Sequence, residues 1–155
     1  SNWNYLNDSN NYTLDDASIE VIVSDSGDSA SIYTSAEGLA SEVIRNGVAN
    51  HRINQGSTNT TPNAGNNLTG TGYTALNRVN STDVIMVKLS TIFNTTANST
   101  ILQNRNLLLH KSSGTLFGSA TISAVSTGAN TLSIAQDFRT AYNKYLTNIG
   151  LSPVA

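Results

Sequence analysis

Apolar and polar residues alternate over residues 18–24, which predicts a β-strand. Ile19, Val21 and Val23 fall on one face at the strand period of two, and polar residues such as Glu20 fall on the other. The β-branched side chains favour the same assignment. We therefore expect a strand with one buried face in the first part of the chain.

Helical spacing follows this strand. From residue 31 to about residue 50, apolar positions recur every three or four residues, which predicts an internal helix with Asp28 or Ser29 as its N-cap. Gly38 and Gly47 weaken the prediction. The apolar positions are Ile32, Ala36, Leu39, Ala40, Val43, Ile44 and Gly47.

A long polar segment interrupts the pattern between residues 55 and 72. Leu68 is its only large apolar residue, and Gly, Ser, Thr, Asn, Pro and Ala make up most of the rest. Such a composition buries too little surface to offset the entropy lost on ordering. We interpret residues 1–155 as a single domain with a flexible polar loop at about 55–72.

Strand character returns in the second half of the chain. Residues 83–93 are apolar on both faces, which predicts a central strand, and residues 94–100 are expected to form a turn or surface loop. Residues 106–110 and 115–125 are predicted as further strands. The intervening residues 111–114 suit a tight hairpin connection.

A helix is predicted at the C-terminal end. Asn130 or Thr131 can cap it, Gly150 ends it, and Pro153 lies just beyond. Its apolar stripe consists of Ala135, Phe138, Ala141, Tyr142, Tyr145 and Ile149. The predicted fold is therefore α+β: an antiparallel β-sheet of four or more strands with one internal helix and one C-terminal helix.

Composition favours neutral polar surfaces over charged ones. Only 38% of the residues are hydrophobic and 12% are charged, and Asn, Ser and Thr fill the difference. Such surfaces are common on virion and extracellular proteins. The chain has no cysteine, which excludes disulfides and thiolate chemistry. Its apolar runs are too short for a spanning helix, so no membrane insertion is expected.

The charges are sorted along the chain. All bases follow residue 44, whereas most acids precede it. The early acids are Asp8, Asp15, Asp16, Glu20, Asp25, Asp28, Glu37 and Glu42. Two interpretations stay open: the acidic third packs against the basic remainder within one chain, or it meets the basic part of a neighbouring copy.

One short motif suggests nucleophilic catalysis. Gly27-Asp28-Ser29-Ala30 follows a predicted strand and resembles the first block of the GDS-type serine hydrolases. The resemblance implies Ser29 as the nucleophile, with a base from an Asp-x-x-His near the C-terminus. Asp137 is followed three residues later by Thr140, so the expected base is missing. The alternative is a polar turn that caps a helix.

Metal and nucleic-acid sites have weaker signals. The acids between Asp15 and Asp28 could supply oxygen ligands for calcium, but they lack the EF-hand spacing. His51 and His110 without cysteine fall short of a zinc site. No cofactor is expected. The bases most suited to contact nucleic acid inside an assembly are Lys88, Arg105 and Lys111.

The sequence therefore favours a non-enzymatic structural subunit that associates with copies of itself into a shell or filament, such as a virion coat or an extracellular surface polymer. The expected localisation is a virion or an extracellular surface. A secreted monomeric ligand- or glycan-binding module using Trp3, Tyr5 or Tyr12 is the alternative. The expected subunit-interface residues are Asp15, Asp16, Glu20, Asp25, Arg78, Lys88, Arg105 and Lys111.

Overall fold

The computed structural model of the chain describes residues 3–4, 13–25, 31–33, 42–45, 48–55, 68–100, 106–109, 111–112, 116–117 and 121–154. Side chains are described over 13–25, 53–55, 68–100 and 121–154. The described part contains two five-stranded sheets, a short hairpin, a 3-10 helix and one α-helix.

The main sheet is antiparallel and has the strand order β12-β2-β6-β7-β8. Its strands are β2 (Ala17–Asp25), β6 (Gly72–Arg78), β7 (Asp83–Lys88), β8 (Thr91–Thr96) and β12 (Thr121–Gly128). β2, β6 and β7 are internal, whereas β8 and β12 form the two edges.

The second sheet has the order β1-β9-β3-β4-β5. Its strands are β1 (Trp3–Asn4), β3 (Ser31–Tyr33), β4 (Glu42–Arg45), β5 (Val48–Arg52) and β9 (Asn106–Leu109). A separate hairpin joins β10 (Lys111–Ser112) to β11 (Leu116–Phe117).

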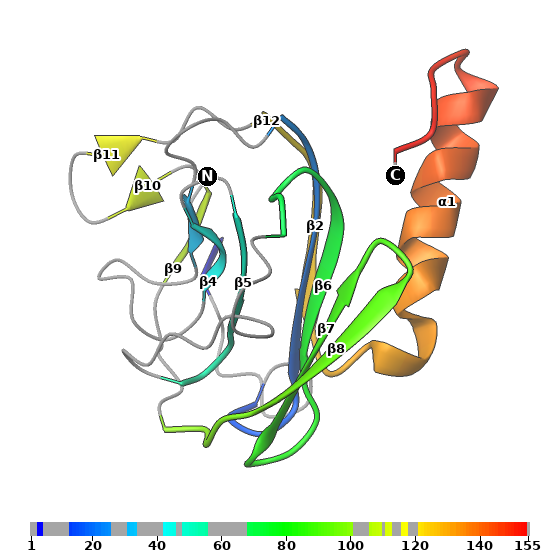
Figure 1. The fold of residues 1–155 in the computed structure, drawn as a ribbon. Helices are drawn as coiled ribbons and strands as arrows, with labels where there is room; N and C mark the ends of the chain where they lie inside the picture. The colour runs from blue at the N-terminus through cyan, green and yellow to red at the C-terminus, as the bar shows by residue number, and fades with distance from the viewer. Residues whose placement is uncertain are drawn as a thin grey trace.

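The main sheet lies between two layers. In Figure 1, α1 (Ala135–Asn148) runs along one side of it, and strands β4, β5 and β9 lie on the other side. The short 3-10 helix η1 (Leu132–Ile134) leads from the sheet into α1. This arrangement gives each face of the sheet a different neighbour.

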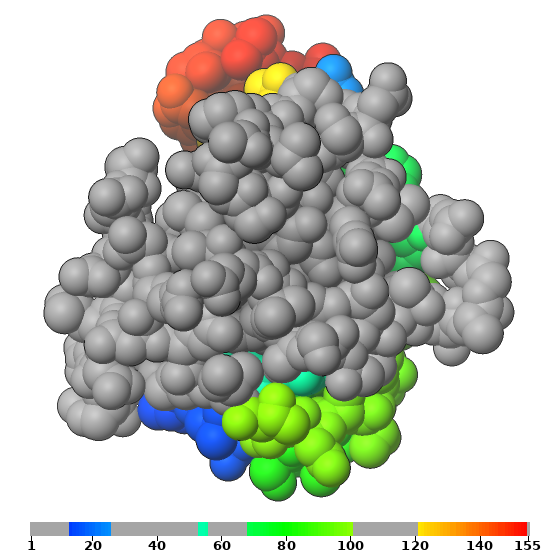
Figure 2. Space-filling view, turned by 90° about the vertical axis from the view of Figure 1, so that its left-hand side faces the viewer, coloured from blue at the N-terminus to red at the C-terminus, as the bar shows by residue number. Residues whose placement is uncertain are grey.

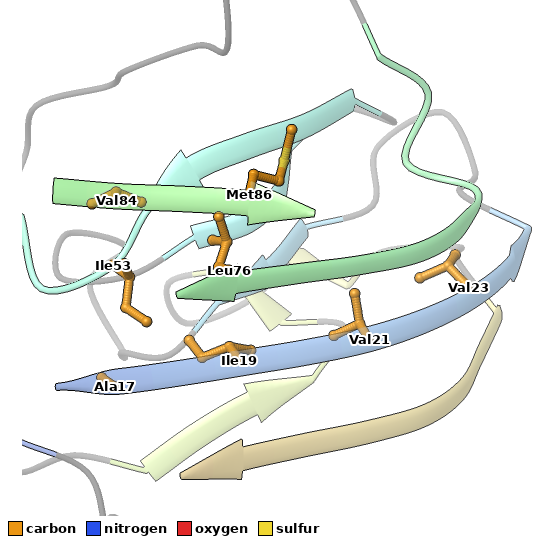
Figure 3. Packing of buried hydrophobic residues seen from close by; sticks show 8 residues of the cluster. All are labelled: Ala17, Ile19, Val21, Val23, Ile53, Leu76, Val84 and Met86. Atoms are coloured by element: carbon orange, nitrogen blue, oxygen red, sulfur yellow. The ribbon is translucent and has the colours of Figure 1, made fainter. Parts of the chain in front are cut away.

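The face turned away from α1 carries the larger apolar cluster. Ile19, Val21 and Val23 of β2 point into it together with Leu76 of β6, as Figure 3 shows. Ile53, just after β5, packs against them and is fully buried. The full cluster is Ala17, Ile19, Val21, Val23, Ile53, Leu76, Val84 and Met86.

The face turned toward α1 carries a smaller apolar cluster. Ile22, Tyr73, Ala75 and Val87 of the sheet pack with Ala135 at the start of α1. The partly buried residues around them are Ala124, Leu132, Phe138, Tyr142 and Val154. The C-terminal helix is therefore held on the sheet by Ala135, Phe138 and Tyr142, and Val154 packs against the same cluster.

The structure confirms the α+β class, the antiparallel sheet and the C-terminal helix. The predicted strand at residues 18–24 is β2, and Gly150 follows the helix with a φ of 81°, a conformation that favours glycine. The predicted cap by Asn130 or Thr131 is not found on α1, whose N-cap is Ile134 without a side-chain hydrogen bond. Asn130 Oδ1 instead accepts the backbone N–H of Leu132, the first residue of η1, at 2.8 Å.

The predicted internal helix over residues 31–50 is wrong in the part that the structure describes. β3, β4 and β5 occupy residues 31–33, 42–45 and 48–52 instead. Arg45 pairs with Val48, and the two residues between them in the sequence are Asn46-Gly47, the dipeptide most typical of a two-residue hairpin. Hairpin pairing of β-branched segments therefore outweighs the helical spacing. Residues 34–41 and 46–47 lie outside the described residues.

Two further boundaries differ from the prediction. The expected single strand over residues 83–93 is a hairpin, because Leu89 adopts a φ of 56° and turns the chain between β7 and β8. β8 continues to Thr96, into the predicted loop. The predicted strand over residues 115–125 is divided between β11 and β12.

The central strand β6 has no counterpart in the prediction. It begins at Gly72, where the polar loop was expected to end, and all seven of its residues are buried. Its sequence mixes one aromatic, one leucine and several small or polar residues, so that hydrophobic alternation is weak. Of the predicted loop, residues 56–67 lie outside the described part of the chain.

Candidate functional site

A polar network lies under the start of α1. Tyr73 Oη contacts Glu20 Oε2 at 3.0 Å and also contacts the carbonyl oxygen of Ala135. The hydroxyl of Thr131 contacts the other oxygen of Glu20. The side chain of Asn77 accepts the backbone N–H of Thr131 at 2.9 Å. This network fixes the entry to the helix onto the sheet.

Hydrogen bonds and burial act in opposite directions on the pKa of Glu20. The Tyr73 hydroxyl has one proton but faces two acceptors, the Glu20 carboxyl and the Ala135 carbonyl. Tyr73 donates to Glu20 Oε2, and the same hydroxyl oxygen lies against the Ala135 carbonyl. Burial raises the pKa of Glu20, against the opposing effect of its hydrogen bonds from Thr131 and Tyr73. Burial is the larger effect, so the pKa of Glu20 lies above its ordinary value.

Burial and the neighbouring Glu20 also raise the pKa of the Tyr73 phenol, and Arg139 of α1 acts in the opposite direction. The phenol therefore stays protonated and acts as a hydrogen-bond donor. Two atoms beside this network, Ser18 Oγ and Asn77 Nδ2, are buried without a hydrogen-bond partner. Ser18 and Asn77 are opposite each other in the β2–β6 register.

Lys88 is buried at the end of β7, with 4% of its surface exposed. Its Nζ donates to the carbonyl of Thr71 at 2.6 Å and to Oγ1 of Thr74 at 3.0 Å. Burial lowers the pKa of Lys88 to about 8. Its ammonium group is thus used inside the protein and is not presented to a partner.

Arg78 is fully buried at the opposite end of the sheet from Lys88 along β6 and β7. Its Nε and Nη2 donate to the carbonyl of Ile53 at 2.9 and 2.8 Å, and its Nη1 donates to the carbonyl of Ala97 at 2.8 Å. The guanidinium therefore joins three separate segments of the chain. This is a structural contact.

Asp15 and Asp16 lie at an exposed corner close to Arg78. Ser99 donates its hydroxyl to Asp15, and the backbone N–H of Asn130 donates to Asp16 at 2.6 Å. Asn54 bonds to the carbonyl of Thr13 at 3.0 Å. In Figure 2 the blue, teal and yellow-green segments that contain these residues lie side by side at the bottom of the molecule.

These positions change the list of expected interface residues. Glu20, Arg78 and Lys88 are enclosed by their own chain, so they are not available to a neighbouring subunit or to nucleic acid. Asp15, Asp16 and Asp25 are exposed. Lys111 belongs to β10, where only the backbone is described, and Arg105 lies outside the described residues.

Asp15, Asp16 and Glu20 all contact neutral donors of the same chain. The described contacts of these three acids therefore do not include the intrachain acid–base pairing that the sorted charges suggested as one interpretation.

The candidates for chemistry fall largely outside the described part of the chain. Asp28, Ser29 and His110 are not among its residues, and of His51 only the backbone in β5 is described. Within the residues that the structure describes, no group of three metal-ligating side chains occurs. No helix there is long and apolar enough to cross a membrane.

The outer edge of β8 is an exposed structural feature that the sequence pattern did not indicate. None of the described strands pairs with this edge. Ile92 is 60% exposed on it, and the strand contains no charged residue and no proline. The β7–β8 register is regular, whereas the β12 edge has two register shifts. Bulges, charges and prolines are the usual protection of an edge strand, and β8 has none of them.

A pocket of about 300 Å³ opens beside the end of β8. Its lining combines apolar and polar residues, most of them from β7 and β8. The lining residues are Val79, Asp83, Val84, Ile85, Asn94, Thr95 and Thr96. The carboxylate of Asp83 already accepts a hydrogen bond from Asn80 Nδ2 at 2.7 Å.

Comparison of the chain with protein-family models, with curated proteins and with solved structures gives no match.

Proposed function

We propose that this protein is a non-enzymatic structural subunit that associates with copies of itself into a shell or filament at a virion or extracellular surface. The observation that carries the proposal is the open edge of β8. The outward-facing backbone groups of Ile92, Asn94 and Thr96 pair with none of the described strands, and an uncharged edge of this kind is a template for another strand. A monomeric protein would ordinarily protect such an edge.

Exposed apolar residues at the far end of α1 supply a second contact surface. Tyr145, Ile149 and Leu151 are 56%, 51% and 57% exposed. In Figure 1 this end of the helix lies at the top, well above β8. A subunit with contact surfaces at separate places can join more than one neighbour, as a shell or filament requires.

The exposed acids Asp15, Asp16 and Asp25 remain candidates for contacts with bases of a neighbouring subunit. The candidate nucleic-acid contacts reduce to Arg105 and Lys111, since Lys88 is buried. We propose no catalytic residue and no cofactor.

Electron microscopy combined with light scattering tests the proposal. We expect the purified chain at high concentration and low salt to form particles or filaments. Raising the ionic strength should weaken those contacts in which exposed acids and bases meet. A chain that stays monomeric under all these conditions, with no particles visible, contradicts the proposal.

The pocket beside β8 favours a second candidate function, a ligand-binding module for a small polar molecule such as a sugar. Its volume is at the lower limit for ligand sites, and Asn94 and Thr96 offer hydrogen-bonding groups. A glycan array or calorimetric titration tests this function. Saturable binding by a stable monomer favours it over self-association.

A further inference from the structure

The direction of the backbone groups on β8 follows from its pairing with β7. The N–H of Ala97 donates to the carbonyl of Thr82 at 2.7 Å, which continues the β7–β8 register. In an antiparallel ladder, hydrogen-bonded and non-hydrogen-bonded pairs alternate. The odd-numbered residues of β8 therefore bond to β7. Ile92, Asn94 and Thr96 direct their N–H and C=O groups to the open side.

From this geometry we propose that β8 pairs with β8 of a second copy, antiparallel and about a two-fold axis, so that the two main sheets become one continuous sheet. The inference rests on the proposed self-association and names its interface. Because the same strand contributes from both copies, the interface is isologous.

The axis fixes the register. The two-fold axis between neighbouring antiparallel strands is perpendicular to the sheet, so each side chain lies on the same face of the joined sheet in both copies. Even-numbered residues must then pair with even-numbered residues, and odd-numbered with odd-numbered. The register centred on Asn94 places Asn94 opposite Asn94 of the second copy and Ile92 opposite Thr96. It is the register that uses all three outward-facing residues of each strand in hydrogen-bonded pairs.

The side chains are compatible with this pairing. The β8 strand carries no charge, so two copies meet without repulsion. Ile92 continues the row formed by Ala75 and Val87 across the sheet, and it is 60% exposed in the single chain. A second β8 removes part of this apolar surface from water. The uncharged strand and its exposed Ile92 therefore favour β8 of a second copy as the pairing partner.

A charge-exchange experiment tests the axis. N94K places two like charges opposite each other across the axis, and so does N94D, whereas a mixture of the two variants places a lysine opposite an aspartate. We expect each variant alone to weaken the dimer at least about tenfold in Kd and the mixture to restore it. Sedimentation velocity measures the association, and circular dichroism checks the fold of each variant.

The matched controls are T121K and T121D on β12, the other edge of the sheet, where Thr121 is exposed. We expect them to leave the association unchanged. If the wild-type chain is monomeric, the proposed function fails. If it associates while N94K and N94D associate equally well, only the β8 interface is overturned. If both single variants weaken association and the mixture does not restore it, the register centred on Asn94 is overturned.

Discussion

The two faces of the main sheet are stabilised in different ways. The face away from α1 is an apolar cluster built on Ile19, Val21 and Leu76, with the buried cations Arg78 and Lys88 at its ends. The face toward α1 has fewer apolar residues and contains the Glu20–Tyr73–Thr131 network. One face depends mainly on packing, and the other depends on satisfied hydrogen bonds.

The difference matters because the two kinds of contact respond to different changes. An apolar cluster is sensitive to lost volume and insensitive to pH. A buried carboxyl or ammonium group links stability to pH, because its pKa differs between the folded and unfolded states. Substitutions on each face therefore separate packing from protonation. These measurements are made at low protein concentration, because association would add to the apparent stability.

The largest effect is expected from Leu76→Ala on the packing face. Leu76 is fully buried among β-branched neighbours, so truncation leaves a cavity in a rigid sheet. We expect a loss of about 3–5 kcal/mol in the free energy of unfolding, measured by denaturant titration. Leu151→Ala, at a position 57% exposed, is the control and should cost no more than about 0.5 kcal/mol. Similar losses at both positions would contradict the assignment of the core.

A smaller loss is expected from Arg78→Met. The substitution keeps the aliphatic stem but removes the donors to the carbonyls of Ile53 and Ala97. The buried carbonyls left without hydrogen bonds should lower the free energy of unfolding by about 2–3 kcal/mol. Arg139→Met on α1 is the matched control and should change stability much less, because its contact with Gln136 is long at 3.5 Å. Denaturant titration measures both, and an Arg78→Met chain as stable as the wild type would contradict the structural role.

Lys88→Met tests the buried ammonium group through the pH dependence of the free energy of unfolding. The pKa of Lys88 is lowered to about 8 in the folded chain, from 10.5, so the unfolded chain binds more protons between these values. Wild-type stability should rise by about 1–2 kcal/mol from pH 8 to pH 9.5. Lys88→Met should lose this rise, whereas Lys144→Met on the exposed side of α1 should keep it. A pH-independent wild type would contradict the burial of the charge.

The smallest effect is expected from Glu20→Gln at pH 5. If Glu20 is protonated there, an amide replaces it with little change, below about 1 kcal/mol, in the free energy of unfolding. Because the folded pKa of Glu20 is raised above 4.5, wild-type stability should fall as pH rises from that value through the folded pKa.

The stability of the Glu20→Gln variant should not show this fall when thermal unfolding is measured at a series of pH values. Asp137→Gln, on an exposed position of the first helical turn, is the control and should retain it. A wild-type profile without the fall would indicate that Glu20 is ionised throughout.

Part of the fold was predictable because its signal is local. The alternation of Ile19, Val21 and Val23 identified β2, and the stripe ending at Gly150 identified α1. β6 could not be found in the same way, since Thr74, Asn77 and Arg78 are buried by strands on both sides and interrupt its hydrophobic pattern. The Leu89 turn was missed because leucine rarely adopts a positive φ.

The candidate site was less predictable than the fold. Charge sorting drew attention to Glu20, Arg78 and Lys88, but their burial depends on residues far away in the sequence. The open edge of β8 depends on the order of strands in the sheet. No property of residues 91–96 alone shows that they form an edge strand.

The sequence by itself thus determined the antiparallel α+β character, the strand Ala17–Asp25 and the final helix, because periodicity within a segment records which of its faces is buried. The tertiary structure alone decided which charges are enclosed, which carboxyl has its pKa raised by burial and which strand edge pairs with none of the described strands. Each of these depends on residues that the fold brings together across the sheet. Burial determines the free-energy penalty of a charged group, and the neighbouring strands determine which hydrogen bonds can form.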